Sequence, residues 1–174
     1  MFSWQPTATQ NMLRLRAAII AKIRAFFTRR NILEVETPLL STSTNPAPHL
    51  HSFSIGQQPI LYLQTSPEFA MKRLLAAGYG DIYKISKAFR DHECGKLHNP
   101  EFTILEWYRT NFNHHDLMDE MDQLLHFILN AAKAERITYQ NLFLQYLNID
   151  PFGPLKTLQE PYKKRRSKTV CPRT

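Results

Sequence analysis

The stretch from residue 82 to residue 109 constrains the fold more than any other part of this chain. Its sequence is IYKISKAFRDHECGKLHNPEFTILEWYR, which predicts two strands joined by a long polar loop. The first strand ends in Phe89-Arg90, and the second opens within Asn99–Phe102. Side chains alternate with period two along a strand. The second strand is therefore expected to place four side chains on one face: Phe102, Ile104, Glu106 and Tyr108.

An arginine at a strand end beside an aromatic ring suits a nucleoside triphosphate. The guanidinium of Arg90 can bind phosphate oxygens in bidentate fashion, and the ring of Phe102 can stack on a base. A β-hairpin with an exposed polar loop and no ligand is the structural alternative. The opposite face of the second strand is expected to serve ordinary packing through Thr103, Leu105 and Trp107.

The basic character of the chain is concentrated at its C-terminal end. The formal charge is +7 over 174 residues, and residues 156–174 carry seven basic side chains and one acid. The rest of the chain is therefore nearly neutral, which argues against a nucleic-acid-binding surface. A basic run such as KKRRSK can bind nucleic acid or anionic surfaces, but it more often forms a solvated or disordered end.

The sequence also excludes several classes of protein. It has no run of about 18 apolar residues, so no transmembrane helix and no membrane partner are expected. The first ten residues lack the basic and apolar regions of a secretory signal. The two cysteines, Cys94 and Cys171, have neither metal-ligand spacing nor a disulfide framework, and His49 and His51 are expected on a surface loop. We expect a cytoplasmic protein without a metal site.

Apolar spacing predicts the remaining elements. Helices are expected over residues 11–30, 66–77, 113–133 and 138–147, and strands over residues 32–38 and 60–63. Asn31 is the expected stop of the first helix. Ser66 is the expected N-cap of the second helix, with Pro67 as its first residue and Gly78 at its end.

Residues 82–109 resemble motif 2 of the class II aminoacyl-tRNA synthetases. The similarity is closest to the lysyl-tRNA synthetase subgroup, through the pattern FRxxxxGxxHNPEFTxLEWY. The helix, strand and proline of residues 11–38 resemble motif 1, although a core helix followed by an edge strand would look the same. The resemblance covers about residues 10–152. It implies an α+β fold, the N-terminal part of a class II catalytic core, with an incomplete antiparallel sheet flanked by helices.

Two shorter patterns resemble a stand-alone branch of that subgroup. They are TSPE followed by MKRLL at residues 65–75, and TYQxxFxxYLxIDP at residues 138–151. Members of this branch attach lysine, preferably β-lysine, to a lysine of elongation factor P. The resemblance implies ATP-dependent activation of lysine or β-lysine as an aminoacyl-adenylate, with magnesium, and a homodimer through motif 1. Motif 1 begins near residue 11, which leaves no room for an anticodon-binding barrel, so tRNA is not an expected partner.

The resemblance also implies roles for individual residues. Arg90 is the expected catalytic residue, holding the α-phosphate of ATP. The expected ATP-binding residues are Arg90, Asp91, His92, His98, Asn99 and Phe102. The expected substrate-binding residues are Ser66, Pro67, Glu68, Glu106 and Tyr108. Structural roles stay open for several of them: a salt bridge for Arg90, core packing for Phe102, capping for Ser66, and helix-dipole compensation for Glu68.

The chain departs from the family pattern in two places. Relatives usually read FRNE where this chain reads FRDH, which puts His92 in place of a glutamate near adenine. The resemblance is lost near Phe152, and motif 3, with the acidic magnesium ligands before it, is absent. We therefore predict a partial catalytic domain over residues 1–152 and a basic, disordered or non-homologous tail over residues 153–174.

Little or no adenylation is expected from this chain alone. Three functions stay open: an elongation factor P–lysine ligase completed by a separate C-terminal half, an inactive remnant or dimerising pseudoenzyme, and a fragment of a lysine–tRNA ligase.

Overall fold

The computed structural model describes residues 4–156, 158 and 159, in two compact units, Met1–Ala132 and Lys133–Thr174. Most of the predicted tail, residues 153–174, lies outside the described residues. None of the described helices is both long enough and apolar enough to cross a membrane.

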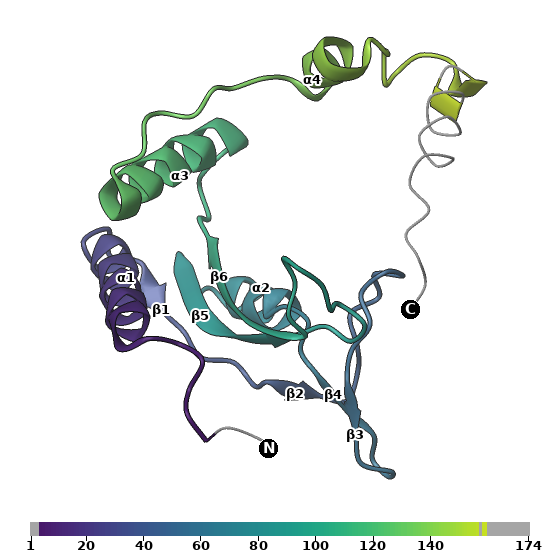
Figure 1. Cartoon of the computed structure of the whole chain (residues 1–174). Helices are drawn as coiled ribbons and strands as arrows, with labels where there is room; N and C mark the ends of the chain where they lie inside the picture. Colours follow the sequence, from purple (N-terminus) through teal and green to yellow (C-terminus); the bar gives the residue numbers. More distant parts are fainter. Residues whose placement is uncertain (1–3, 157, 160–174) are drawn as a thin grey trace. The chain divides into compact units, whose positions relative to one another are not determined.

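The main sheet of the first unit is built around the predicted hairpin (Figure 1). Strand β5 (Ile82–Phe89) pairs antiparallel with β6 (Glu101–Tyr108) along the full length of both. On its other edge β5 pairs in parallel with the short strand β1 (Leu33–Glu34). The two strands predicted over residues 82–109 are therefore confirmed, whereas the strand predicted over 32–38 keeps only two paired residues.

A second small sheet follows β1 in the chain. Its strand order is β2 (Leu40–Ser41), β4 (Leu61–Leu63) and β3 (Ser54–Ile55), all antiparallel. The strand predicted over residues 60–63 is present as β4. Strands β2 and β3 were not predicted, because two residues are too few to show an alternating pattern.

Helix α1 (Gln10–Thr28) covers one face of the main sheet, and its N-cap is Thr9. Phe26 and Phe27 are its buried side chains, and the ring of Phe27 stacks on Tyr83 with centroids 4.4 Å apart. Asn31 follows the helix with a φ of 55°, the left-handed conformation expected at a helix stop. Burial and a hydrogen bond to Glu34 raise the pKa of the Tyr83 phenol to about 12.

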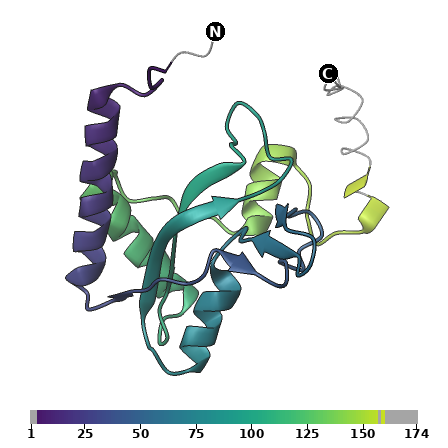
Figure 2. The ribbon, with the colours of Figure 1, turned by 90° about the horizontal axis from the view of Figure 1, so that it is seen from below.

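Helix α2 (Glu68–Ala76) covers the opposite face of the main sheet. Met71 is fully buried there and belongs to one apolar cluster with Val35 and Ile82. Figure 2 shows α1 and α2 on opposite sides of the β5–β6 hairpin. The helix begins later than predicted, because Pro67 has a ψ of 1° and serves as the N-cap residue instead of the first helical residue. Gly78 follows the helix with a φ of 83°, as expected for its end.

Helix α3 (His114–Leu129) packs beside α1 on the same face of the sheet, through Leu124. Its N-cap Asn113 forms a capping box with Asp116. It ends four residues before the predicted boundary, because Asn130 adopts the left-handed conformation that terminates a helix. In the second unit, helix α4 (Tyr139–Leu147) begins after the N-cap Thr138, close to its predicted bounds.

Candidate functional site

The structure brings Arg90 and Phe102 together on one face of the main sheet. Arg90 follows the last residue of β5, and its Cζ atom lies 5.1 Å from the centroid of the Phe102 ring. This separation is within the range of a cation–π contact. The Nε atom of Arg90 donates to the backbone oxygen of Thr65 at 3.4 Å, and a terminal nitrogen lies 3.7 Å from the carboxylate of Glu93. Both Arg90 and Phe102 are partly buried and therefore still reach solvent.

The opposite face of β6 serves packing, as expected from the alternation of side chains. Thr103 accepts a hydrogen bond from Arg16 of α1, and Leu105 and Trp107 pack against the cluster around Phe27. On β6 the packing residues therefore lie on one face, and the residues predicted to bind ligand, Phe102, Glu106 and Tyr108, lie on the other.

A hydrogen-bonded cluster lies farther along the face that carries Phe102. The carboxylate of Glu106 accepts two hydrogen bonds, from Ser66 Oγ through Oε2 and from the Tyr108 hydroxyl through Oε1, both at 2.7 Å. Burial and this contact with Glu106 raise the pKa of the Tyr108 phenol. Three of the five predicted substrate-binding residues thus form one preorganised group with a carboxylate at its centre.

The start of α2 supplies the other two predicted substrate-binding residues. Ser66 Oγ also accepts a hydrogen bond from the backbone of Glu68 at 3.1 Å, so it supports the helix start while it contacts Glu106. Pro67 is fully buried and offers no polar side chain to a ligand. Glu68 forms an ion pair with Lys72, one turn farther along the helix.

The loop between β5 and β6 carries the remaining predicted ATP-binding residues. The Asp91 backbone amide donates to the His51 oxygen at 2.8 Å, which fixes the start of the loop. His92 has a φ of 64° and a side chain that is 78% exposed. The side chains of His98 and Asn99 are also exposed. Among the described contacts, none of these side chains reaches Arg90 or Phe102.

A cavity of about 380 Å³, lined by both polar and apolar side chains, adjoins this face of the sheet. Thr65 and Ser66 line it, and these residues also contact Arg90 and Glu106. Hydroxyl and amide side chains form much of its outer wall, at Ser41, Ser43, Thr44 and Asn45. The sequence predicted only a turn-rich loop over residues 41–52, although its run of hydroxyl side chains was a possible signal of a cavity lining.

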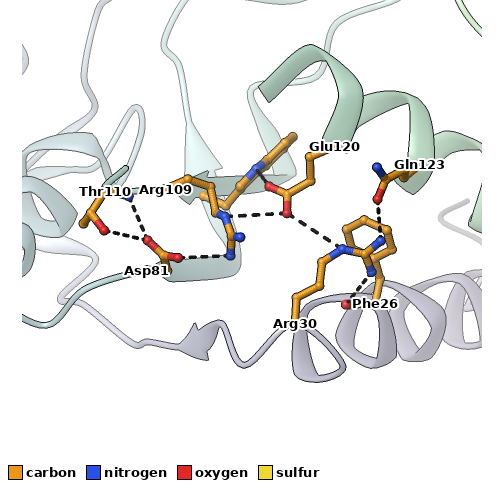
Figure 3. Close-up of polar contacts among 8 residues, drawn as sticks. Phe26, Arg30, Asp81, Arg109, Thr110, Glu120 and Gln123 are labelled. Carbon is orange, nitrogen blue, oxygen red and sulfur yellow. Dashed lines mark hydrogen bonds and ion pairs between the residues drawn. The ribbon is translucent and has the colours of Figure 1, made fainter. Parts of the chain in front are cut away.

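A network of charged residues around the buried Glu120 supports the end of β6 from the opposite face (Figure 3). Glu120 of α3 accepts a hydrogen bond from the Trp107 indole at 3.1 Å, and its other oxygen lies 3.6 Å from Arg109 and 3.8 Å from Arg30. Arg109 also pairs with Asp81 at 3.1 Å. These contacts hold α1, α3 and the end of β6 together directly behind Glu106 and Tyr108.

The side chains on this face of the sheet can make two kinds of contact. The Arg90 guanidinium can form hydrogen bonds to anionic oxygens, and the Phe102 ring can stack on another aromatic ring. Within the described ranges, no group of three or more His, Cys, Asp or Glu side chains could hold a metal ion. No chemical step is assigned to the magnesium that the family resemblance implies.

Comparison with known proteins places this sequence in a family. The model of the family described as tRNA synthetases class II (D, K and N) matches residues 2–169. A protein of Photobacterium profundum, named elongation factor P–(R)-β-lysine ligase, is 52% identical over 165 residues, which are 90% of this chain and 51% of that protein. A protein of the same name from Vibrio vulnificus is 55% identical over 155 residues, 85% of this chain and 48% of that protein.

The chain spans about half the length of the curated relatives it matches. The family predicted from the motif 2 pattern is confirmed, because the family model covers nearly the whole sequence. On this evidence the chain belongs to the class II tRNA synthetase family, and it is similar to the elongation factor P–(R)-β-lysine ligases.

Proposed function

We propose that this chain supplies the ATP- and amino-acid-binding part of a ligase that activates lysine or β-lysine and transfers it to a lysine of elongation factor P. The names of the similar proteins support the substrates. The single observation that carries the proposal is the placement of Arg90, Phe102 and the Glu106 cluster on one face of the β5–β6 hairpin.

The proposed reaction has two steps. The carboxylate of the amino acid attacks the α-phosphate of ATP, which gives an aminoacyl-adenylate and releases pyrophosphate. The amine of the acceptor lysine then attacks the adenylate carbonyl and releases AMP. Neither step requires a covalent bond to the protein, so positioning and charge stabilisation are what the protein contributes.

Arg90 and Phe102 are assigned to the nucleotide. The guanidinium of Arg90 would hold the α-phosphate and stabilise the charge that develops there during attack. The Phe102 ring would stack on adenine, with the base taking the place of solvent on its open side. The ion pair from Arg90 to Glu93 is long and partly exposed, so phosphate oxygens can replace it at low cost.

Glu106 and Glu68 are assigned to the amino acid. The carboxylate of Glu106 is oriented by Ser66 and Tyr108, and a carboxylate fixed in this way can accept charge-assisted hydrogen bonds from a substrate ammonium. Glu68, at the first turn of α2, provides a second acid nearby. Both acids act electrostatically on Tyr108, and two neighbouring acids suit an amino acid that carries two amines.

Homodimer formation is part of the same proposal. The motif 1 helix α1 exposes about half or more of the surface of Met12, Leu13 and Leu15. These side chains line an apolar groove of about 470 Å³ between α1 and the main sheet. Exposed apolar surface of this kind favours contact with another protein surface. A role limited to dimer formation, without catalysis, is the alternative that this groove supports.

Binding of diamino acids tests the proposed function. In calorimetric titrations, lysine and β-lysine are expected to bind roughly tenfold or more tightly than norleucine, which lacks the side-chain amine, because a hydrogen bond to a charged group is worth about 1.5–3 kcal/mol. The Glu106→Gln variant is expected to lose this preference. Glu101→Gln is the matched control, since Glu101 lies on the same strand and pairs with Lys87 on the surface. Equal affinities for lysine and norleucine in the unmodified chain would contradict the proposal.

A further inference from the structure

The face of the main sheet that carries Glu106 also contains a buried cation to which the proposed reaction assigns no role. Lys84 is 3% exposed and lies on β5, directly opposite Glu106 on β6. Lysine is almost never fully buried unless its charge is paired. Among the ion pairs formed by the described residues, however, none includes Lys84. Its burial therefore requires another explanation.

The ammonium group of Lys84 is held by a single residue of the neighbouring segment. Nζ donates to the backbone oxygen of Thr37 at 2.8 Å and to its Oγ1 atom at 2.6 Å. Burial lowers the pKa of Lys84, and the fields of Glu36 and Glu106 act in the opposite direction. The two hydrogen bonds to Thr37 thus replace part of the hydration that the ammonium loses.

Thr37 lies between β1, which ends at Glu34, and the segment that lines the cavity. The next residue, Pro38, lines the cavity, and so do residues 41 and 43–46 farther along the segment. The pairing of β2 with β4 holds this segment at Leu40–Ser41. Lys84 holds the same segment at Thr37, the residue just before the cavity lining begins.

Burying an ammonium group costs free energy that packing alone does not require. Removing a charge from water costs several kcal/mol, and an apolar side chain of similar volume would fill the same space without that cost. The ammonium group instead supplies directional contacts, because its two hydrogen bonds fix both the main chain and the side chain of Thr37.

We propose that Lys84 is a positioning residue. Its ammonium holds Thr37 against strand β5 and thereby fixes the cavity wall at residues 38–46 relative to Glu106. The structural part of this inference stands without the proposed function. Its consequence for ligand affinity rests on that function.

Hydrogen–deuterium exchange of the whole chain tests the structural part. In Lys84→Met, the amides of residues 39–45 are expected to exchange roughly tenfold or more faster, because two hydrogen bonds to a charged donor are lost. The amides of α1 are expected to keep their rates. Lys84→Arg, which retains a charged donor, is expected to restore most of the protection. Unchanged exchange at residues 39–45, or an equal increase in α1, would overturn the inference.

Thr37→Val provides a second variant in case Lys84→Met fails to fold. It removes the Oγ1 acceptor and keeps the backbone oxygen, so a smaller increase, roughly threefold, is expected in the same amides. An exchange pattern identical to that of the unmodified chain would also overturn the inference.

Lysine affinity separates the two proposals. Lys84→Met is expected to weaken lysine binding roughly fivefold or more through the displaced wall, and Lys84→Arg to recover part of it. Unchanged affinity in Lys84→Met, in a chain that still prefers lysine to norleucine, would overturn the positioning role and leave the proposed function intact. A chain with no such preference would overturn the proposed function, and the exchange rates would then decide the role of Lys84 alone.

Discussion

Replacing Glu120 by alanine is expected to lower the free energy of unfolding by about 3–5 kcal/mol, the range for removing one partner from a buried ion pair. The Glu120 side chain is only 5% exposed and faces the guanidinium groups of both Arg30 and Arg109. The Nε atom of Arg109 is buried and makes no hydrogen bond in the described structure, so it depends on the nearby carboxylate for compensation. Without Glu120, the Trp107 indole also loses its acceptor.

Two controls identify the source of this effect. Glu120→Gln keeps an oxygen for the Trp107 indole but removes the charge, so a smaller loss of about 1–3 kcal/mol is expected. Glu101→Ala removes a carboxylate from an exposed ion pair with Lys87, where a loss of about 0–1 kcal/mol is expected. Urea unfolding followed by circular dichroism measures all three. A loss in Glu120→Ala no larger than that in Glu101→Ala would show that the network contributes little to stability.

The second large effect is expected in the affinity for ATP when Arg90 is replaced by alanine. A guanidinium on phosphate oxygens forms charge-assisted, often bidentate hydrogen bonds, each worth about 1.5–3 kcal/mol, so affinity should fall roughly tenfold or more. Arg90→Lys is expected to recover only part of this loss, because an ammonium group cannot reproduce the planar fork. Calorimetric titration with ATP at fixed ionic strength is the measurement.

Lys87→Ala is the matched control for Arg90. Lys87 lies three residues earlier on β5 and pairs with Glu101, away from the face that carries Phe102. Its removal changes the net charge by the same amount as Arg90→Ala, and ATP affinity is expected to change less than about twofold after correction for salt. A similar loss in both variants would mean that ATP responds to overall charge and not to a site at Arg90.

The hairpin and its two faces could be predicted from the sequence because they follow from local rules. The period of two placed Phe102, Glu106 and Tyr108 on one face, and the contacts of Ser66 and Arg90 agree with that placement. The family also followed from this segment, because its motif is long and specific. The roles of the individual site residues stay predictions.

Features that depend on contacts between distant parts of the chain could not be predicted. Lys84 and Thr37 are 47 residues apart, and no local pattern shows that a lysine in a strand will be buried against a threonine. The Glu120 network likewise exists only once α3 packs behind β6. Errors at element ends have local causes: Asn130 ends α3 early, and only two residues of the predicted 32–38 strand find a partner in β5.

The central claim is that Arg90 and Phe102 together bind ATP, and the position of adenine relative to the Phe102 ring tests it most directly. In nuclear magnetic resonance spectra of the chain with ATP, we predict nuclear Overhauser contacts between the adenine protons and the ring protons of Phe102. The Phe102→Leu variant identifies these signals by their loss. Binding of ATP without any contact to the Phe102 ring would contradict the claim.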